Sequence, residues 1–324
     1  MNSAAGSEYH GIGHAKLLLF GEHAAVYAYP AVGVGLPDCT TLSLMPTGDD
    51  AWSAPDLPPP YRPWFDALTA ALESEIPGDA AAVRGRIRLV STVPVAQGFG
   101  SSATLCTALA QAALRALTES QTVADGKVWA LANRLERIFH GTPSGIDTGL
   151  AIHQGVTAFS FHGDELPSAR RINGGNFFLV AGSVPRSAGT KELVGAIGSR
   201  MREGDRRTAE LLAELGRIAS DACDAIPAAV DVVGRMNLAG LTGRAHRALE
   251  ALGLGNDRLN QCLHLGMKAG ALGGKLSGAG GGGAFYLVCH DRESAASVAR
   301  GLAQSGIVDA ETIRSVAIQN GATA

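Results

Sequence analysis

The stretch PVAQGFGSSAT, residues 94–104, separates an apolar strand pattern from an apolar helix pattern. Ile87, Leu89 and Val93 precede it with the alternation of a β-strand, and residues 105–117 repeat leucine and alanine at helical spacing. Glycines let a backbone approach an anion closely, and the N–H groups and dipole of a helix start favour negative charge. The stretch therefore predicts a phosphate-binding loop whose serine hydroxyls reach phosphate oxygens or Mg²⁺. A well-capped helix is the simpler alternative.

The two most easily recognised phosphate loops are absent from the sequence. It has no Gly-x-x-x-x-Gly-Lys-Ser/Thr pattern, and residues 98–100 lack the third glycine and the acidic follow-on of the dinucleotide fingerprint. The rest of the chain must therefore decide what residues 94–104 bind.

A second glycine-rich run, KLSGAGGGGA at residues 275–284, leads into the apolar, strand-like residues 285–288. Four successive glycines are costly in conformational entropy, so they indicate a place where the backbone comes close to another group. A flexible hairpin is the alternative interpretation.

Near the N-terminus, GHAKLLLFGEHAAVY at residues 13–27 predicts an apolar strand with ionisable side chains at its ends. Lys16 stands at the start of the strand, and Glu22 and His23 follow the glycine that closes it. Such a strand holds charged groups at the edge of a rigid element. The alternative is a strand whose ends are merely solvated.

The fourth informative segment is ERIFHGTPSGID, residues 136–147. A helix that starts near Val128 is expected to carry Glu136 in its last turns and to break at Gly141 and Pro143, with Asp147 in the tight turn that follows. Two carboxylates separated by such a break can face one cavity from different directions. A turn aspartate that caps its own backbone is the alternative.

In this order the four segments resemble the motifs of the GHMP small-molecule kinases, most closely of the members that act on mevalonate. Residues 16–27 resemble the family's first motif, and residues 98–103 resemble its Gly-Leu-Gly-Ser-Ser-Ala loop. Residues 140–147 are similar to His-Gly-x-Pro-Ser-Gly-x-Asp, and residues 270–283 to the third motif. The resemblance implies an α+β, two-lobe GHMP kinase fold with the active site between the lobes.

The same resemblance implies how the lobes divide and what they do. Residues 1–174 are expected to form the N-terminal lobe, with the ATP-binding loop and the catalytic aspartate, and residues 175–324 the C-terminal lobe with the third motif. The implied activity is ATP-dependent phosphorylation of the primary hydroxyl of mevalonate, giving 5-phosphomevalonate and ADP for isoprenoid precursor biosynthesis.

Roles for individual residues follow from the resemblance. Asp147 corresponds to the catalytic base, and Lys16 to the lysine that pairs with it and with the transferring phosphoryl group. Ser102 and Glu136 correspond to the Mg²⁺ ligands. This chemistry suits the residue types, because phosphoryl transfer depends mainly on positioning and on neutralisation of charge.

Two larger sets of binding residues are implied in the same way. The substrate set is Lys16, Glu22, His23, Asp147, Thr190 and Gly280. The ATP set is Gln97, Gly98, Phe99, Gly100, Ser101, Ser102, Ala103, Thr104, Gly280 and Gly281.

The chain departs from the family pattern at two positions. Phe99 replaces the usual leucine of the loop, which exchanges one apolar residue for another. Ala188 stands two residues before Thr190, where many relatives have a basic residue, and Arg186 is the candidate replacement. The acceptor is therefore less firmly implied than the reaction, and phosphomevalonate or a sugar is the alternative substrate.

A ligand-sensing protein on the same fold is the non-enzyme alternative. Such a protein would be expected to lose a catalytic residue. The retention of all four candidate groups therefore favours an enzyme: Lys16, Ser102, Glu136 and Asp147.

Composition narrows the remaining possibilities. With 324 residues, two lobes are expected, and a net charge of −3 argues against nucleic acid or an acidic membrane surface as partner. No apolar run is long enough to span a membrane, and residues 1–6 lack the basic start of a signal peptide, so a cytoplasmic enzyme is expected. A homodimer is compatible with the sequence. The five cysteines show no metal or disulfide spacing and are expected to be reduced.

Further periodic patterns predict the other elements. Residues 63–72 are expected to be helical, and residues 176–182 form a buried strand pattern. Three more helices are expected over residues 192–215, 217–226 and 228–252.

Overall fold

The computed structural model describes residues 7–48, 51–76, 79–163, 166–187 and 189–323. The chain forms two compact units. Unit 1 consists of Met1–Ala15, Asp38–Val93 and Gly100–His153, and unit 2 of Lys16–Pro37, Pro94–Phe99 and Gln154–Ala324. Strands β1 (Tyr9–Phe20) and β2 (Ala31–Pro46) contribute residues to both units.

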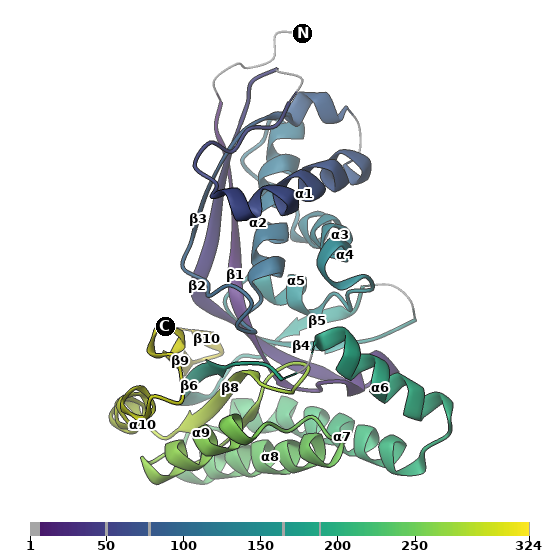
Figure 1. Ribbon diagram of the computed structural model, residues 1–324. Coiled ribbons are helices and arrows are strands. Elements are labelled where there is room, and N and C mark those ends of the chain that lie inside the picture. The colour runs from purple at the N-terminus through teal and green to yellow at the C-terminus, as the bar shows by residue number, and fades with distance from the viewer. Residues whose placement is uncertain (1–6, 49–50, 77–78, 164–165, 188, 324) are drawn as a thin grey trace. The chain divides into compact units, whose positions relative to one another are not determined.

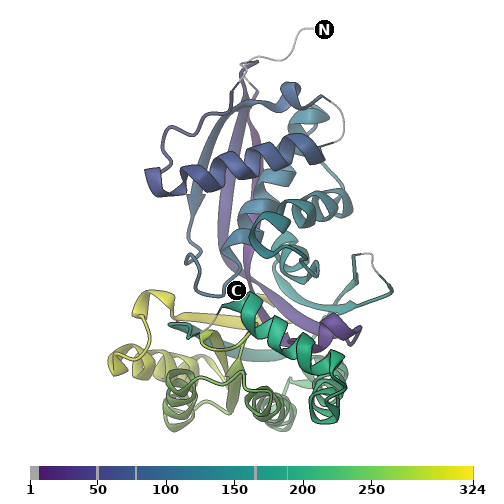
Figure 2. The same cartoon turned by 45° about the vertical axis from the view of Figure 1, so that its right-hand side comes forward.

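Unit 1 is built from antiparallel strands and a layer of helices (Figure 1). The C-terminal part of β2 pairs with β3 (Gly85–Ser91), from Thr40 opposite Ser91 to Pro46 opposite Gly85. The helices are α1 (Arg62–Glu75), α2 (Ser101–Leu117), α3 (Asp125–Leu135), α4 (Arg137–His140) and α5 (Ile146–Ile152). Figure 2 shows the same unit turned by 45°.

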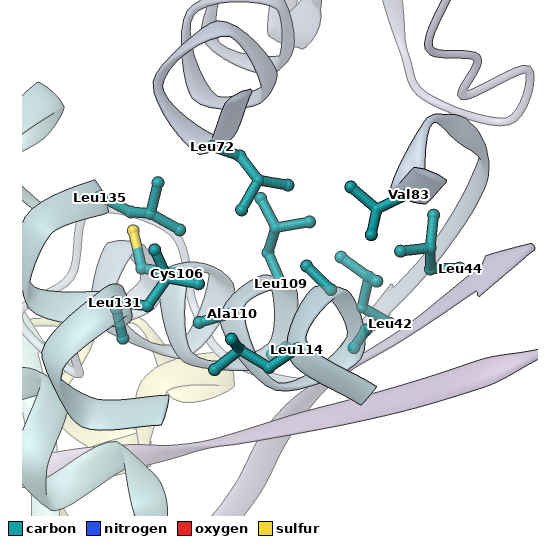
Figure 3. Packing of buried hydrophobic residues seen from close by; sticks show 14 of the residues in the cluster. Leu42, Leu44, Leu72, Val83, Cys106, Leu109, Ala110, Leu114, Leu131 and Leu135 are labelled. Atoms are coloured by element: carbon teal, nitrogen blue, oxygen red, sulfur yellow. The ribbon is translucent and has the colours of Figure 1, made fainter. Parts of the chain in front are cut away.

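The core of unit 1 lies between its strands and helices, around α2 (Figure 3). Leu42 and Leu44 of β2 and Leu72 of α1 meet Leu109 of α2, and all four side chains are buried. Each buried leucine contributes about 1.5–3 kcal/mol relative to an exposed one. This packing anchors α2 and thereby the loop from which it starts.

Unit 2 contains two groups of antiparallel strands. In the first, β4 (Gly155–Ser160) pairs with the N-terminal part of β2 and with β5 (Ser168–Arg171). The second is a sheet in the order β10-β9-β6-β8-β7. Its strands are β6 (Asn176–Val184), β7 (Gly273–Leu276), β8 (Gly283–Cys289), β9 (Arg314–Gln319) and β10 (Ala322–Thr323).

Five helices complete unit 2, and α8, α9 and α10 pack against its second sheet. They are α6 (Thr190–Arg202), α7 (Arg206–Ala228), α8 (Val232–Ala251), α9 (Asp257–Lys268) and α10 (Arg292–Ser305). Short 3₁₀ turns lie at Ala24–Tyr27, Pro59–Tyr61, Ala80–Val83 and Ala310–Thr312.

Most of the predicted elements are confirmed. The helix expected at residues 63–72 is α1, and the buried strand at residues 176–182 is β6. The helix after the glycine loop begins at Ser101, four residues earlier than its apolar pattern. Glu136 was expected in the last turns of one helix, and it lies between two: it is the C-cap of α3, and the short helix α4 continues from it to the predicted break at Gly141.

The predicted boundaries of the helices after residue 190 are wrong. The helical structure is interrupted at residues 203–205. There the Asp205 carboxylate accepts hydrogen bonds from the backbone N–H groups of Arg207 and Thr208 and caps the start of α7. Gly216, at which a break was expected, lies inside α7. A Cβ atom there would lie 2.2 Å from Cδ1 of Tyr29, so this glycine admits an aromatic ring and does not end the helix.

The α+β class is confirmed by this mixture of helices and antiparallel sheets. All five cysteines are free thiols. Within the described residues, no helix is long and apolar enough to cross a membrane. The division into lobes at residue 174 stays a prediction.

Candidate active site

In unit 1, the first turn of α2 and the end of α3 bring two of the predicted residues together. The Ser102 hydroxyl donates a hydrogen bond to Oε1 of Glu136 at 2.7 Å. Glu136 is only 1% exposed although it carries a carboxylate. The serine is held there because Gly100, with φ of 81°, turns the chain directly into α2.

His140 is a third member of this cluster. Its Nε2 lies 3.2 Å from Oε1 of Glu136 and 3.4 Å from Oγ of Ser102. His140 is one helical turn after Glu136, which places the two side chains on the same face. His140 lies within the fourth sequence segment, but no role was predicted for it. Its spacing of four residues from Glu136 was the available signal.

The chemistry of this cluster fits a magnesium ion. Mg²⁺ is a hard cation that prefers oxygen ligands and usually takes only one or two carboxylates from the protein, completing its shell with waters and phosphates. A hydroxyl and a carboxylate oxygen 2.7 Å apart offer this kind of partial shell. Within the described chain, no group of three or more histidine, cysteine, aspartate or glutamate side chains forms a metal cluster of the protein-only kind.

Asp147 was expected in a tight turn, but it lies in the first turn of a helix that was not predicted, α5, where it is half-buried. The turn before it is held by the Trp129 indole, which donates to the Gly145 carbonyl at 2.8 Å, and by Thr148, whose hydroxyl donates to the same carbonyl at 3.3 Å. Gly145 has φ of 84°, a conformation that an alanine would resist. A carboxylate on this turn is therefore rigidly placed.

Two residues of the predicted ATP set turn their side chains into unit 1. Ala103 and Thr104 are fully buried. The Thr104 hydroxyl donates to the Ser101 carbonyl and lies 2.8 Å from the hydroxyl of Thr40. The Thr104 side chain thus joins α2 to β2, whereas the side chains of Ser101 and Ser102 are half-buried.

The first half of the glycine loop belongs to unit 2. The Lys16 backbone N–H donates to the Phe99 carbonyl at 2.9 Å, which joins the loop to β1. Gln97 accepts a hydrogen bond from the Ser183 hydroxyl, and the Phe99 side chain is buried. A Cβ atom at Gly98 would lie 2.8 Å from the backbone nitrogen of Ala284, so the loop touches the second glycine run and needs a glycine at this point.

Glu22 and His23 lie in the turn that follows β1, and both are buried. The Glu22 carboxylate accepts a hydrogen bond from the ammonium of Lys275, a residue of β7 that is 0% exposed. His23 donates from Nε2 to the Ala279 carbonyl at 2.9 Å. Burial lowers the pKa of His23, so its ring is neutral near pH 7 and keeps a lone pair on Nδ1.

Lys275 begins the second glycine-rich run, and no role was predicted for it from the sequence. Burial lowers the pKa of its ammonium, and the charge of Glu22 opposes this effect. A charged residue inside the otherwise apolar, glycine-rich β7 was the available signal, because such a residue must find a partner when it is buried.

The predicted ligands Gly280 and Gly281 are closely packed within unit 2. The Gly281 N–H donates to the Leu254 carbonyl, and the Gly281 carbonyl accepts from the backbone and hydroxyl of Ser187. A Cβ atom at Gly280 would lie 2.6 Å from the Leu254 carbonyl oxygen. These glycines therefore make a tight backbone turn in which Gly281 is bonded to the chain itself.

Thr190 begins α6, and its hydroxyl accepts a hydrogen bond from Arg186 at 3.1 Å. The same guanidinium lies beside the glycine run, since a Cβ atom at Gly283 would be 2.7 Å from its Nε. Ala188, at which the chain departs from the family pattern, lies outside the described residues. Arg186 is thus a cation next to both Thr190 and the second glycine run.

Family models identify the class of protein to which this site belongs. The model of the GHMP kinases N terminal domain matches residues 66–155, and that of the GHMP kinases C terminal matches residues 228–308. Together they cover more than half of the chain. The chain therefore belongs to the GHMP kinase family.

Within the family, the chain is similar to proteins named mevalonate kinase. It is 27% identical to that of Thermococcus onnurineus over 309 residues, which are 88% of this chain and 90% of the relative. It is 26% identical to that of Pyrococcus horikoshii over 326 residues, covering 93% and 95% of the two chains.

Solved structures agree on the fold. The L. major mevalonate kinase in complex with R-mevalonate superimposes with a TM-score of 0.80 at 22% identity, covering 97% of this chain and 96% of that one. The Streptococcus pneumoniae phosphomevalonate kinase gives 0.73 at 14% identity, covering 96% and 99%. The fold is therefore common to members whose names refer to different acceptors.

Proposed function

We propose that the chain transfers the γ-phosphoryl group of ATP to the primary hydroxyl of mevalonate, giving 5-phosphomevalonate and ADP. The observation that carries this proposal is the sequence match to relatives named mevalonate kinase, which extends over 88% and 90% of the paired chains. The proposed enzyme is cytoplasmic, works in isoprenoid precursor biosynthesis, and has small molecules as its partners.

Asp147 is the proposed base and Lys16 the proposed cation for the transferring phosphoryl group. Phosphoryl transfer passes through a loose transition state, so a base need only accept the hydroxyl proton late in the reaction. The rigid first turn of α5 suits Asp147 to this task, because positioning contributes most of the rate. Lys16 is buried at the point where β1 bonds to the glycine loop, which holds its backbone in place.

Ser102 and Glu136 are the proposed holders of Mg²⁺. When bound, this ion supplies positive charge that neutralises the phosphate oxygens. Ser102 offers a hydroxyl oxygen, and Glu136 offers a carboxylate that is already aimed at that hydroxyl. His140, on the same carboxylate oxygen, helps to orient Glu136.

The proposed ATP cradle is the loop at residues 97–104 together with Gly280 and Gly281. Support comes from the helix start at Ser101, whose N–H groups and dipole favour a phosphate. The proposed acceptor set joins Lys16 and Asp147 with Glu22, His23, Thr190 and Gly280. In this set His23 keeps a neutral ring nitrogen that can accept a hydrogen bond from a hydroxyl.

A GHMP kinase with another acceptor is the second candidate. The observation that favours it is the equally extensive fold match to phosphomevalonate kinase, together with the absence of a basic residue at position 188. A ligand-sensing protein is the non-enzyme candidate, and the retention of Lys16, Ser102, Glu136 and Asp147 argues against it.

One assay separates these candidates. ADP release is measured with mevalonate, phosphomevalonate, galactose or homoserine supplied in parallel, with a control that contains no acceptor. Mevalonate is expected to give the highest kcat/KM. If galactose or phosphomevalonate exceeds it by about tenfold, which is a transition-state difference of about 1.4 kcal/mol, the acceptor assignment is wrong and the kinase assignment stands. No ADP release with any acceptor would favour the sensing protein.

A further inference from the structure

The ion pair between Glu22 and Lys275 is buried inside unit 2. Lys275 is 0% exposed, and besides Glu22 its ammonium donates to the Leu276 carbonyl at 2.6 Å. The rings of Tyr286 and Phe20 lie beneath the same ammonium, with centroids at 5.4 Å and 5.9 Å. A buried ammonium is costly unless such groups compensate it.

Three further side chains join the same two stretches of unit 2 through four hydrogen bonds. Ser277 accepts from the Leu18 N–H at 3.0 Å and donates to the Leu18 carbonyl at 2.9 Å. The Tyr286 hydroxyl donates to the Leu19 carbonyl at 2.7 Å, and His23 bonds to the Ala279 carbonyl. The end of β1 and its turn are thus attached to β7, β8 and the glycine run between them.

The turn that these contacts hold is itself strained. His23 has φ of 59°, which is uncommon for a residue with a side chain. A conformation of this kind persists only where the surrounding structure enforces it. Glu22, the residue immediately before His23, is the one fastened to Lys275.

From these contacts we infer that Lys275 is a positioning residue for the acceptor. It holds the Glu22 carboxylate, and through it the turn that presents His23, against the glycine run at residues 275–284. Within the proposed acceptor set, Glu22 then acts by keeping the turn with His23 in place, and it does not touch the acceptor itself. This inference rests on the proposed function, since it concerns the same acceptor site.

A double-mutant cycle tests the inference. Lys275→Met leaves the Glu22 carboxylate buried without its cation, and Glu22→Gln leaves the ammonium without its anion. The double variant Glu22→Gln/Lys275→Met removes both charges, so no unpaired charge remains buried. Replacement of both members of a buried ion pair is often tolerated in a protein interior. The exposed Lys268 in α9 provides the matched control Lys268→Met.

The readouts are KM for mevalonate, KM for ATP, and the dissociation constant of mevalonate measured by calorimetry without ATP. Lys275→Met is expected to raise KM and the dissociation constant for mevalonate by about tenfold, with a smaller change in KM for ATP. The double variant is expected to regain most of this loss. Lys268→Met is expected to behave like the parent.

Three results would overturn the inference. The first is a KM for mevalonate in Lys275→Met that equals the parent's, and the second is an equal rise in the KM values for mevalonate and ATP. The third is a double variant that binds mevalonate no more tightly than Glu22→Gln does, as expected if Glu22 touches the acceptor. If neither single variant folds, the double variant decides: mevalonate affinity near the parent's supports the inference, and a tenfold loss rejects it. If the double variant also fails to fold, Ser277→Ala decides, because it loosens the same attachment without burying a charge and should raise KM for mevalonate.

Failure of the proposed function would look different. It would appear in the parent protein as a preference for another acceptor in the ADP-release panel. The cycle is then measured with that acceptor, so the positioning role of Lys275 is judged separately from the identity of the substrate.

Discussion

Two glutamates of this protein are equally buried, and they differ in what stands beside them. Glu22 in unit 2 and Glu136 in unit 1 are each 1% exposed. Glu22 accepts from a lysine that the chain itself buries, whereas Glu136 accepts from the Ser102 hydroxyl and lies beside the half-exposed His140. Burial alone therefore does not say what a carboxylate does.

The partner of each carboxylate indicates its use. A buried carboxylate with a resident ammonium is compensated inside the fold, so its charge serves to hold segments together. A carboxylate joined to a hydroxyl oxygen offers a second oxygen to a hard cation. We therefore propose positioning for Glu22 and the holding of Mg²⁺ for Glu136, and measurements of stability and of the Mg²⁺ requirement test this contrast directly.

The largest expected effect is on stability. Glu22→Gln should lower the free energy of unfolding by about 3–5 kcal/mol, because it leaves the Lys275 ammonium buried without a counter-charge. Glu136→Gln should cost only about 1 kcal/mol, because its amide oxygen can still accept from Ser102. Urea unfolding followed by circular dichroism measures both variants. Equal losses would remove the distinction between the two glutamates.

The next effect concerns Asp147, a carboxylate with a third role. Asp147→Asn should keep ATP and mevalonate binding but lose about 10²-fold or more in kcat, because the variant cannot accept the hydroxyl proton. Steady-state kinetics with binding measured separately tests this. Asp125→Asn is the control, since Asp125 is an exposed residue of unit 1 bonded to His153. A folded Asp147→Asn protein within threefold of the parent kcat would reject the catalytic role.

A smaller effect is expected in the magnesium requirement. Ser102→Ala and Glu136→Gln should each raise the Mg²⁺ concentration for half-maximal activity by about tenfold, since each removes or weakens an oxygen ligand. Glu22→Gln should leave that concentration near the parent value. Ser74→Ala is the control for the serine, because Ser74 is an exposed residue that bonds only within α1 in the described contacts. An unchanged requirement in both Ser102→Ala and Glu136→Gln would place the metal elsewhere.

The smallest effect is in the pH dependence of stability. Burial lowers the pKa of His23 below 6.5, so the unfolded chain binds this proton more readily than the folded protein. Stability should therefore fall as the pH drops from 6.5 toward the folded pKa, with a slope of at most about 1.4 kcal/mol per pH unit from this residue.

The variant His23→Asn measures that contribution. Asparagine tolerates the left-handed backbone at this position and can still donate to the Ala279 carbonyl. The fall in unfolding free energy between pH 7 and pH 5 should be smaller in this variant than in the parent. His10→Asn, at an exposed histidine of β1, is the matched control substitution. Identical slopes in the parent and His23→Asn would show that His23 is not held neutral by burial.

The sequence predicts a local structure where residue type and spacing within a few positions determine it. The glycine and serine run before the helix at residue 101 predicted where a backbone turn meets a helix start, and the structure places α2 there. A helical break at Gly141 was predicted from that glycine and from Pro143, and α4 ends at His140 directly before it. Both predictions depend only on neighbours within a few residues, and the order of the motifs already indicated the family.

Long-range packing decided what these local patterns could not. Gly216 was expected to break a helix, but the ring of Tyr29 lies against it and α7 continues. Glu22 and Lys275 are 253 residues apart, and nothing near either residue predicts the other. Their pairing arises because folding removes both from water, and a charge without water must take its compensation from whichever group the tertiary structure brings within reach.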